Sequence, residues 1–533
     1  MKHLFLLLII FLSLDIRAQI ITEKYPDAEY KKSNITIPVF SFPEVDHKAM
    51  LAEDKLESST KDVPMRFAIA FDREIDLIEE GYTYIDKQGN SNWLIELNLP
   101  GAFGVGVLFS DFQIPDGAEL FVFNEDQSSV NGAITSINNN SRKILHVTPV
   151  QGEKIYVLYT QPSNAAFKGI LKIDIVTHLY RDVFHFDKNF GDSGSCNVNV
   201  SCAEGDPWAD EIRAVAMIIN ENGNRWCTGA LVNNTSLDGT PYLLTAEHCL
   251  PSDLTDVGVW SFIFNYISED CSPSVNGLLG NSIFGSELRA SNITNDFALL
   301  ELDEAPPSDY DVYYSGWSRS TLLISSTTTI HHPSGDVMKI SGDDDAPVLS
   351  AYLGGAGSDY WKISDWDYGT TEGGSSGSPL FNPSGKIIGQ LRGGFASCSN
   401  DLADYYGAFH KSWNVGSIAS ARLMDWLDPS GDDPNSLAGA NLSSLGIEDL
   451  TSNYNFSLYP NPSSTKINLS VEQNLYVDHI VISDMAGRII QDLSIEQHIK
   501  EAVQIDISSL SNGVYQLTVI GKSSNNTMLF IKE

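Results

Sequence analysis

Short runs of alternating apolar residues, separated by glycine, proline and asparagine, recur along most of the 533-residue chain. Typical runs are NWLIELNL, AELFVFN, FALLEL and GVYQLTVI. A period of two residues places successive side chains on opposite faces of a strand, and many short strands of this kind pack as sandwiches or barrels. The sequence therefore predicts an all-β protein. A chain of this length is too long for a single core, so several domains are expected.

Composition divides the chain into five parts. Residues 1–19 combine a short basic start with an apolar run from Leu4 to Leu14 that is too short to cross a bilayer, and we interpret them as a cleaved signal peptide. The other predicted parts are a loosely ordered polar lead-in to about residue 65 and a β-sandwich within 20–190, two β-barrels in 191–442, a linker in 443–454 and a small β-sandwich in 455–533. No later stretch is apolar enough to span a membrane, so we expect no span in the mature chain.

The charge of the chain excludes one class of partner. It has 33 Lys and Arg residues against 69 Asp and Glu residues, a formal net charge of −36. Such a surface repels phosphate backbones, so nucleic-acid binding is not expected, whereas basic peptides are attracted. The simpler interpretation is that the acidic surface keeps an exported protein soluble, and we expect a monomer.

The cysteines all lie in the middle of the chain, and they are Cys196, Cys202, Cys227, Cys249, Cys271 and Cys398. An even number in an exported protein predicts disulfides, although the spacing leaves the pairing open. Zinc binding is the alternative, but no Cys-x-x-Cys pair occurs, so no metal site is predicted. The neighbouring His331 and His332 are interpreted as a structural turn before Pro333, because adjacent rings rarely bind one ion.

Three short segments carry the residue types that a nucleophilic serine needs. PYLLTAEHC contains His248, NDFALLEL contains Asp296 and TEGGSSGSPLF contains Ser376. Serine hydrolysis requires a nucleophile, a base that takes its proton and a carboxylate that orients the base. Taken singly, a structural histidine, a strand-capping aspartate and a Gly/Ser linker are the simpler interpretations. Their order along the chain is that of the chymotrypsin arrangement, and together they predict a catalytic triad.

The glycines around Ser376 add a second prediction. They allow a tight turn in which the amides of Gly374 and Ser376 point at one developing oxyanion. A linker would not normally continue directly into PLF and a buried strand such as KIIGQL.

With these residues in place, residues 191–442 closely resemble the bacterial lysyl endopeptidases, a branch of the trypsin-like fold. The matching segments include GSCNVNVSC, CTGALVNNT, LTAEHC, DFALLEL, IHHPSG, TEGGSSGSP and GQLRGG. The resemblance implies a double β-barrel and a secreted endopeptidase that cleaves after lysine or arginine without a cofactor. It also implies the disulfide pairs Cys196–Cys398, Cys202–Cys271 and Cys227–Cys249.

The residues that select the substrate are also predicted from this resemblance. The position six residues before Ser376, which holds a carboxylate in pancreatic trypsins, is Thr370 here, and the resemblance points instead to Asp404 in ADYYGAF. Asp404 as an ordinary loop carboxylate is the alternative. The family usually carries a histidine where this chain has Arg392, beside Gly393, and Tyr352 is the expected aromatic partner of that side chain. A guanidinium there stacks on Tyr352 but repels a basic substrate or attracts an acidic one, so altered specificity is the second hypothesis.

Two features concern activation. Ser375 stands where pancreatic zymogens hold the aspartate that binds a freed N-terminal amine, so activation by such an internal salt bridge is not expected. Residues 20–190 resemble the pro-segment of the same enzymes, and we expect them to keep the enzyme latent and to assist folding. Lys188 is a candidate self-cleavage site, whereas the start of the mature family members corresponds to Gly191, after Phe190.

The C-terminal part, with LYPNPSSTKINL and ISDMAGRII, resembles the sorting domain of bacterial type IX secretion. The resemblance implies export by that machinery and a secreted or surface-attached protein, and a generic adhesion or carbohydrate-binding module is the alternative. From a different functional class, the whole chain is alternatively a surface adhesin on an inactive protease scaffold. The intact His248, Asp296 and Ser376 argue against that alternative.

Overall fold

The computed structural model describes residues 36–57, 61, 63–182, 193–220, 223, 225–250, 257–272, 277, 280–322, 324–441, 456–471, 475–484, 489–499, 503–521 and 525–532. The chain divides into two compact units, residues 1–442 and 443–533. The predicted signal peptide, the predicted linker and the processing positions Lys188, Phe190 and Gly191 lie outside the described residues. Within the described part, no helix is both long and apolar enough to cross a membrane.

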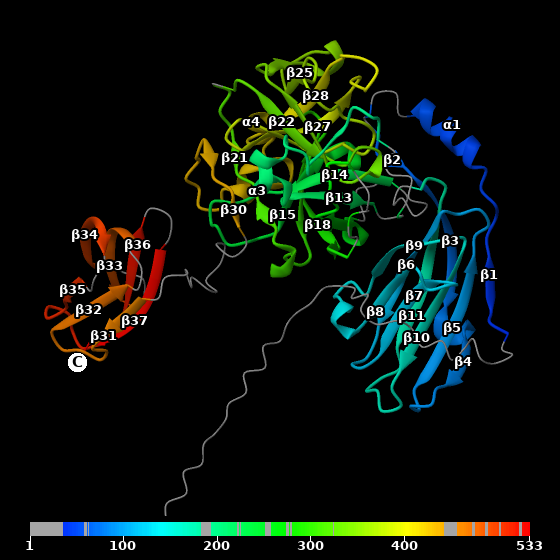
Figure 1. Ribbon diagram of the computed structural model, residues 1–533, viewed down its shortest axis with the longest axis horizontal. Helices are drawn as coiled ribbons and strands as arrows, with labels where there is room; N and C mark the ends of the chain where they lie inside the picture. Colours follow the sequence, from blue (N-terminus) through cyan, green and yellow to red (C-terminus); the bar gives the residue numbers. More distant parts are fainter. Residues whose placement is uncertain are drawn as a thin grey trace, which may run out of the picture. The chain divides into compact units, whose positions relative to one another are not determined.

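A β-sandwich occupies most of residues 36–182 (Figure 1). Its elements are β1 (Val39–Ser41), α1 (His47–Glu57), β3 (Ala68–Asp76), α2 (Leu77–Glu80), β4 (Tyr82–Ile85), β5 (Ser91–Asn98), β6 (Gly104–Gln113), β7 (Glu119–Asn124), β8 (Val130–Ile134), η2 (Ser136–Asn138), β9 (Leu145–Gln151), β10 (Lys154–Gln161) and β11 (Ile170–Leu179). In this part of the described chain, one sheet has the order β1-β5-β10-β7-β8, with β4 on β5, and the other has the order β3-β11-β6-β9. Alternating apolar side chains of both sheets meet in one core that includes Ile95, Val107 and Val157.

The prediction of a loosely ordered lead-in before residue 65 is wrong for the residues described there. Strand β1 pairs in parallel with β5, and α1 is a regular 11-residue helix. The helix sequence HKAMLAEDKLE has little amphipathic pattern, so its periodicity gave no signal. Tertiary contacts hold it instead, above all through the buried Asp54.

Two further sheets form the part between residues 193 and 441. The strands of the first are β13 (Val215–Ile219), β14 (Arg225–Leu231), β15 (Tyr242–Ala246), β16 (Ser261–Phe264), β17 (Ser282–Phe284), β18 (Ser286–Asn292) and β19 (Phe297–Leu302), joined by β2 (Met65–Arg66). The strands of the second are β12 (Val198–Asn199), β21 (Trp317–Ser318), β22 (Thr327–His331), β23 (Lys339–Asp343), β24 (Val348–Ser350), β25 (Tyr360–Ile363), β26 (Pro379–Phe381), β27 (Ile387–Gly394), β28 (Asp404–Ala408) and β29 (Ser436–Leu437). Strands β20 (Tyr313–Tyr314) and β30 (Ala440–Asn441) pair separately.

Short helices connect these strands. They are η3 (Asp206–Trp208), α3 (Ala209–Ile212), η4 (Glu247–Cys249), η5 (Val257–Val259), η6 (Ser308–Tyr310), η7 (Pro333–Gly335), η8 (Tyr352–Gly354), α4 (Phe409–Ser412), η9 (Ala419–Ala421) and α5 (Met424–Leu427). One apolar cluster packs Val215 and Leu244 of the first sheet against Ile330, Phe381 and other side chains of the second. The two sheets therefore share a core at their junction.

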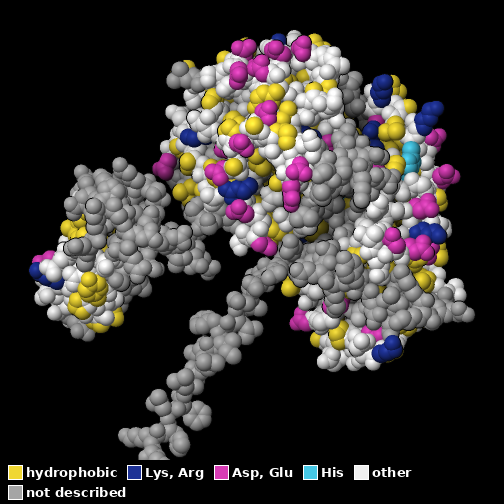
Figure 2. All heavy atoms as spheres, in the orientation of Figure 1, with side chains coloured by type: hydrophobic (Ala, Val, Ile, Leu, Met, Phe, Trp, Pro, Cys, Tyr) yellow, Lys and Arg dark blue, Asp and Glu magenta, His cyan; other side chains and the backbone are white. Residues whose placement is uncertain are grey.

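The N-terminal region also shares a core with the first of these sheets. Phe67 stacks on Trp226 with ring centroids 4.3 Å apart, and both belong to a cluster with Leu179, Met217 and other buried side chains. Strand β2 pairs antiparallel with β14, so the N-terminal region adds a strand to that sheet (Figure 1). On the surface of this unit, acidic side chains are spread over the visible face, in agreement with the net charge of −36 (Figure 2).

The second unit is a small β-sandwich. Its strands are β31 (Phe456–Tyr459), β32 (Lys466–Val471), β33 (Leu475–Asp484), β34 (Ile489–Ile499), β35 (Val503–Asp506), β36 (Gly513–Gly521) and β37 (Asn525–Lys532). In the described residues they form one sheet of order β31-β32-β35 and one of order β34-β33-β36-β37. Ile467, Ile480, Ile505 and Leu517 lie in the core between them. The all-β prediction is thus confirmed for the described residues of both units.

Three disulfides join Cys196 to Cys398, Cys202 to Cys271 and Cys227 to Cys249. These are the three pairs that the family resemblance implies. Cys227 lies on β14 and Cys249 closes η4, so the last bridge anchors the turn that carries His248.

The disulfides close loops of very different length, and this difference leads to a prediction about the free energy of unfolding. Cys196 and Cys398 are 202 residues apart, whereas Cys227 and Cys249 are 22 apart. Because a longer closed loop restricts the unfolded chain more, replacing both cysteines by serine should lower the free energy of unfolding by about 5 kcal/mol for the long loop and about 3 kcal/mol for the short one. Denaturant unfolding of the two double variants measures the difference. An equal loss, or a larger loss for the short loop, would contradict this expectation.

Candidate active site

His248 and Asp296 are joined by two hydrogen bonds. The Nδ1 of His248 lies 2.8 Å from Oδ2 of Asp296, and the backbone amide of His248 donates to Oδ1 at 2.9 Å. The Asp296 side chain is 1% exposed and that of His248 is 12% exposed. A buried carboxylate bonded in this way holds Nδ1 as the protonated nitrogen and leaves Nε2 as the free base.

The loop that carries Asp296 is held from both sheets. Asp296 adopts a left-handed backbone conformation with φ of 55° just before β19, a conformation that Asp tolerates better than most residues. Its carbonyl accepts hydrogen bonds from the amide of Glu247 at 3.1 Å and from Nε2 of Gln390 at 3.1 Å. Gln390 belongs to β27 of the second sheet, so this contact crosses the junction.

Ser376 lies in a turn that two glycines make possible. Gly374 has φ of 94° and Gly377 has φ of 81°. A Cβ on Gly374 would lie 2.3 Å from Nε1 of Trp226, and one on Gly377 would lie 2.2 Å from Oγ1 of Thr245. Only glycine combines this backbone conformation with such close approach. The turn therefore packs closely against the first sheet.

Thr228 on β14 fixes this turn to the first sheet. Its amide donates to the Ser376 carbonyl at 2.8 Å, and its hydroxyl donates to the Gly374 carbonyl at 2.9 Å. The serine of one sheet and the His–Asp pair of the other are thereby held at one junction.

The Ser376 hydroxyl donates a hydrogen bond to the backbone carbonyl of Lys61 at 3.0 Å. Nε2 of His248 is buried and has no hydrogen-bond partner among the described residues. The structure thus brings His248 and Asp296 into contact, whereas the Ser376 proton is directed at a residue of the N-terminal region.

The Lys61 side chain fills a buried pocket. Its Nζ donates to Oδ1 of Asp404 at 2.9 Å, to the hydroxyl and carbonyl oxygens of Thr371 at 2.8 and 2.9 Å, and to the Ala396 carbonyl at 2.8 Å. Asp404 is 0% exposed at the start of β28, and its Oδ2 accepts from Thr371 Oγ1 at 2.7 Å and from Trp366 Nε1 at 3.0 Å. Every oxygen of this carboxylate is therefore bonded, and the lysine ammonium neutralises its charge.

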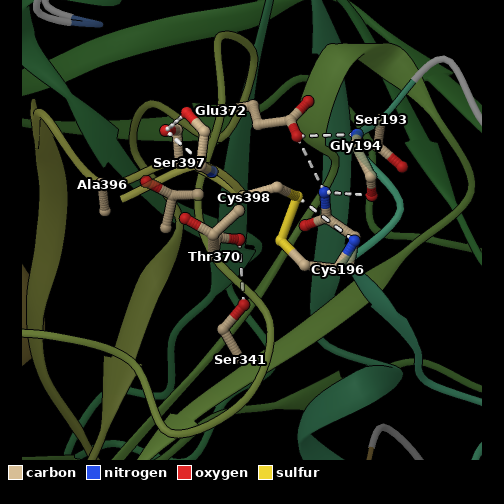
Figure 3. The surroundings of a disulfide bond; sticks show 12 residues. Ser193, Gly194, Cys196, Ser341, Thr370, Glu372, Ala396, Ser397 and Cys398 are labelled. Carbon is tan, nitrogen blue, oxygen red and sulfur yellow. Dashed lines mark hydrogen bonds between the residues drawn. A yellow bond between two sulfur atoms is a disulfide. The ribbon is translucent and has the colours of Figure 1, made fainter. Parts of the chain in front are cut away.

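A disulfide braces one side of this pocket. Figure 3 shows the Cys196–Cys398 bond beside Ala396 and Thr370. Glu372 accepts hydrogen bonds there from the amide of Gly194 at 2.7 Å and from Asn197 at 2.9 Å. The segment that begins near Gly194 is thus bonded to Cys398 and to Glu372, which are close in sequence to the pocket residues Ala396 and Thr371.

Arg392 stacks between two tyrosines. Its guanidinium carbon lies 4.2 Å from the ring centroid of Tyr352 and 5.6 Å from that of Tyr360, and Nη1 donates to the Tyr360 hydroxyl at 2.7 Å. Burial lowers the pKa of Arg392, but the Asp296 carboxylate and Tyr360 outweigh it and raise that pKa, so the group stays charged. Burial raises the pKa of Tyr360 to about 12. A fixed positive charge therefore lies close to the His–Asp pair.

The two adjacent histidines have structural partners. His331 Nδ1 lies 2.8 Å from the Ser375 hydroxyl and Nε2 lies 3.1 Å from that of Ser341, while His332 Nδ1 lies 3.1 Å from the Asp336 carbonyl. Complete burial lowers the pKa of His331 well below its ordinary value and that of His332 to about 4, so both rings are neutral. In the described residues no group of three metal-ligating side chains occurs.

The structure thus brings some of the predicted site residues into contact. It also places at the site further residues that were not predicted from the sequence. Asp404 and Ser376 both contact Lys61, and Arg392 contacts Tyr352. Gly393 pairs with Tyr405 in the sheet and, in the described residues, has no hydrogen bond to Lys61. Thr371, Trp366, Ala396 and Lys61 were missed. Only the position of Thr371 next to Thr370 offered a signal in the sequence.

The fold and this cluster together define a class. Two β-sheets share a core, with a buried His–Asp pair on one and a glycine-flanked serine on the other, and this is the architecture of the trypsin-like proteases. Residues 190–407 match the family model described as "Lysyl endopeptidase, C-terminal domain", and residues 457–533 match "Secretion system C-terminal sorting domain". Both resemblances predicted from the sequence are confirmed, and with them a secreted or cell-surface location.

A curated relative shows the same similarity. The lysyl endopeptidase of Pseudomonas aeruginosa is 29% identical over 260 residues, which cover 46% of this chain and 55% of that protein. The chain thus spans about half the length of this relative.

Solved structures are similar to part of the chain as well. The protease Anisep from Arthrobacter nicotinovorans has 18% identity and a TM-score of 0.29, and the match covers 40% of this chain and 93% of that one. A Glu endopeptidase has 18% identity and a TM-score of 0.27, with 41% and 92% covered.

Proposed function

We propose that this protein is a secreted serine endopeptidase that cleaves peptide bonds after basic residues, lysine above all. Ser376 is the nucleophile, His248 the base and then the acid, and Asp296 the carboxylate that orients the histidine. The observation that carries the proposal is the way in which the chain binds its own Lys61, with the ammonium on Asp404 and the carbonyl at the Ser376 hydroxyl.

The proposed reaction follows from these positions. Ser376 Oγ attacks the carbonyl carbon of the residue whose side chain lies on Asp404, while Nε2 of His248 takes the hydroxyl proton. The amides of Gly374 and Ser376 donate to the oxyanion, each such donor contributing about 3–4 kcal/mol to transition-state stabilisation. His248 then protonates the leaving amine, and a water activated by the same nitrogen hydrolyses the acyl-enzyme. These steps use side chains and amides of the chain alone and need no cofactor.

Selection of lysine rests on the electrostatics of the pocket. A fully buried carboxylate is strongly unfavourable unless a cation neutralises it, so a substrate with an apolar side chain leaves Asp404 unpaired. Thr371 and Ala396 supply three oxygens around the bound ammonium. Together with Asp404 Oδ1 they offer four acceptors to the ammonium, so each of the three N–H donors of a lysine finds a partner.

The sorting-domain match supports a second proposal. Residues 457–533 would be recognised by the secretion machinery, which is the partner expected from the sequence. Protein or peptide substrates with basic residues are the other proposed partners.

Replacement of Asp404 tests the specificity. Asp404→Asn keeps the shape of the side chain but removes the buried charge, and loss of such a pairing is worth about 3–5 kcal/mol. In the mature enzyme, we expect kcat/KM for lysyl substrates to fall at least about 100-fold, since each 1.4 kcal/mol is tenfold. Hydrolysis of matched peptides with Lys or Leu before the cleaved bond provides the measurement. If both substrates lose activity equally, Asp404 does not select the side chain.

Replacement of Asp296 tests the triad. Asn tolerates the left-handed conformation found at this position, so Asp296→Asn should fold normally. Its amide would favour the wrong tautomer of His248, and kcat should fall about 10⁴-fold. Kinetics and a thermal melt of the same preparation distinguish this loss from unfolding. Activity near that of the unaltered enzyme would remove Asp296 from the mechanism.

Arg392 supports the second hypothesis, altered specificity. Its guanidinium is fixed on Tyr352 near the His–Asp pair and attracts acidic side chains of a substrate. We expect lysyl peptides with a Glu immediately before the lysine to be cleaved about threefold faster than those with Gln, a preference worth under 1 kcal/mol, as is usual for an exposed ion pair. Arg392→Gln should abolish this preference and leave cleavage of the Gln peptide nearly unchanged. A preference that survives in Arg392→Gln would contradict the role.

A further inference from the structure

Lys61 occupies the candidate active site although it belongs to the N-terminal region. Its Nζ makes four hydrogen bonds in the Asp404 pocket, and its carbonyl accepts from Ser376. Lys61 is 7% exposed and Asp404 is 0% exposed. Because the pocket is already filled by a lysine, no basic side chain of another peptide can enter it.

The backbone at Lys61 is held in an unreactive arrangement. Lys61 has φ of 59°, a left-handed conformation that is unfavourable by roughly 1–2 kcal/mol for a residue with a Cβ. The Ser376 proton is donated to the Lys61 carbonyl oxygen rather than to His248. For attack, Ser376 must instead donate to Nε2 of His248 and present its oxygen lone pair to the carbonyl carbon.

The chain before Lys61 and the chain after it are joined by side-chain contacts of Asp54. Asp54 on α1 precedes Lys61, and Arg66 on β2 follows it, and the two side chains bond at 2.8–2.9 Å. Asp54 also accepts from Arg181 at 2.8 Å and from the Tyr180 hydroxyl at 2.7 Å. Burial raises the pKa of Asp54, but these bonds outweigh it and hold that pKa below its usual value. Ion pairs around the buried Asp54 therefore join the chain before Lys61 to the chain after it.

The C-terminal side of the loop is fixed to the first sheet as well. Met65 and Arg66 pair with Trp226 and Arg225 of β14, and Arg225 donates to the Pro64 carbonyl at 2.7 Å. The next residue, Phe67, stacks on Trp226. Farther along the chain, Arg142 forms an ion pair with Asp303 at 2.7 Å.

We propose that residues 36–182 are an intramolecular inhibitor of the protease domain and that Lys61 is its substrate-mimicking residue. The proposal rests on the function proposed above, because it assigns to Lys61 the place of the lysine before the cleaved bond. The proposal also gives the predicted latency of the enzyme a specific physical cause, namely the occupied pocket. The candidate self-cleavage site at Lys188 concerns only the removal of the N-terminal region.

The ion pair between Asp54 and Arg66 explains why such a segment inhibits the protease instead of being cleaved and released as a substrate. Attack by Ser376 would form an ester with the Lys61 carbonyl carbon and break its bond to the nitrogen of residue 62, which takes a proton from His248. Because the Asp54–Arg66 ion pair joins the chain before Lys61 to the chain after it, the new amine remains tethered to the acyl-enzyme. It re-forms the peptide bond and releases Ser376 in competition with water.

Occupancy of the pocket can be tested without catalysis. In the full chain with Ser376→Ala, which cannot process itself, we compare Lys61→Gln with Lys55→Gln, which alters an exposed lysine of α1 in the same segment. The probe is p-aminobenzamidine, whose amidinium pairs with a buried carboxylate. We expect Lys61→Gln to increase its affinity at least about 100-fold, Lys55→Gln to leave it unchanged, and Asp404→Asn added to Lys61→Gln to abolish binding. Equal binding by the chain with Lys61 intact would overturn the proposal.

Activity separates this proposal from the proposed function. With Ser376 intact, the Lys61→Gln full chain should hydrolyse a lysyl amide at least about 100-fold faster than the unaltered full chain, while Lys55→Gln should not. If the chain freed of its N-terminal region is active but the full chain is equally active, the inhibitor proposal is wrong. If the freed chain cleaves nothing although the probe binds as expected, the proposed function is wrong and the occupied pocket stands.

Discussion

The neutralisation of Asp404 is the interaction on which the site depends. A carboxylate without any exposure to water carries a desolvation penalty of several kcal/mol, and only a bonded cation offsets it. Trp366 and Thr371 bond to one of its oxygens, but neither brings a positive charge. A cation inside the pocket therefore stabilises it. In this chain Lys61 supplies that cation, so the proposed selectivity for lysine and the proposed self-inhibition depend on the same buried charge.

The junction between the two sheets depends on a few backbone contacts. Thr228 bonds to the carbonyls of Gly374 and Ser376, and Gln390 bonds to that of Asp296. These bonds run in opposite directions, from the first sheet to the serine turn and from the second sheet to the aspartate loop. Neither sheet alone positions its part of the site, which is why the shared apolar core at the junction matters for chemistry as well as for stability.

Trp226 connects the N-terminal region with the serine turn. One side of its ring packs on Phe67, and its Nε1 lies 2.3 Å from the position that a Cβ of Gly374 would take. The N-terminal region thus covers the side chain against which the turn is built, in addition to filling the pocket. This arrangement is consistent with the expected part of that region in folding, because burying a tryptophan by stacking is worth more than area alone predicts.

The sequence alone determined the all-β class and the location of the cysteines, and it predicted part of the candidate site. His248, Asp296 and Ser376 were recognisable because each lies in a short motif beside an apolar strand, and such local patterns report burial and turns directly. Lys61 was not recognisable. It lies 343 residues from Asp404 in a polar segment without periodicity, and no local pattern states which distant cation neutralises a buried carboxylate. The helix α1 was missed for the same reason, since two ion pairs, with Arg66 and with Arg181, hold it rather than an apolar stripe. Long-range charge pairing is decided only when the chain is folded, because its strength depends on desolvation by the surrounding tertiary structure.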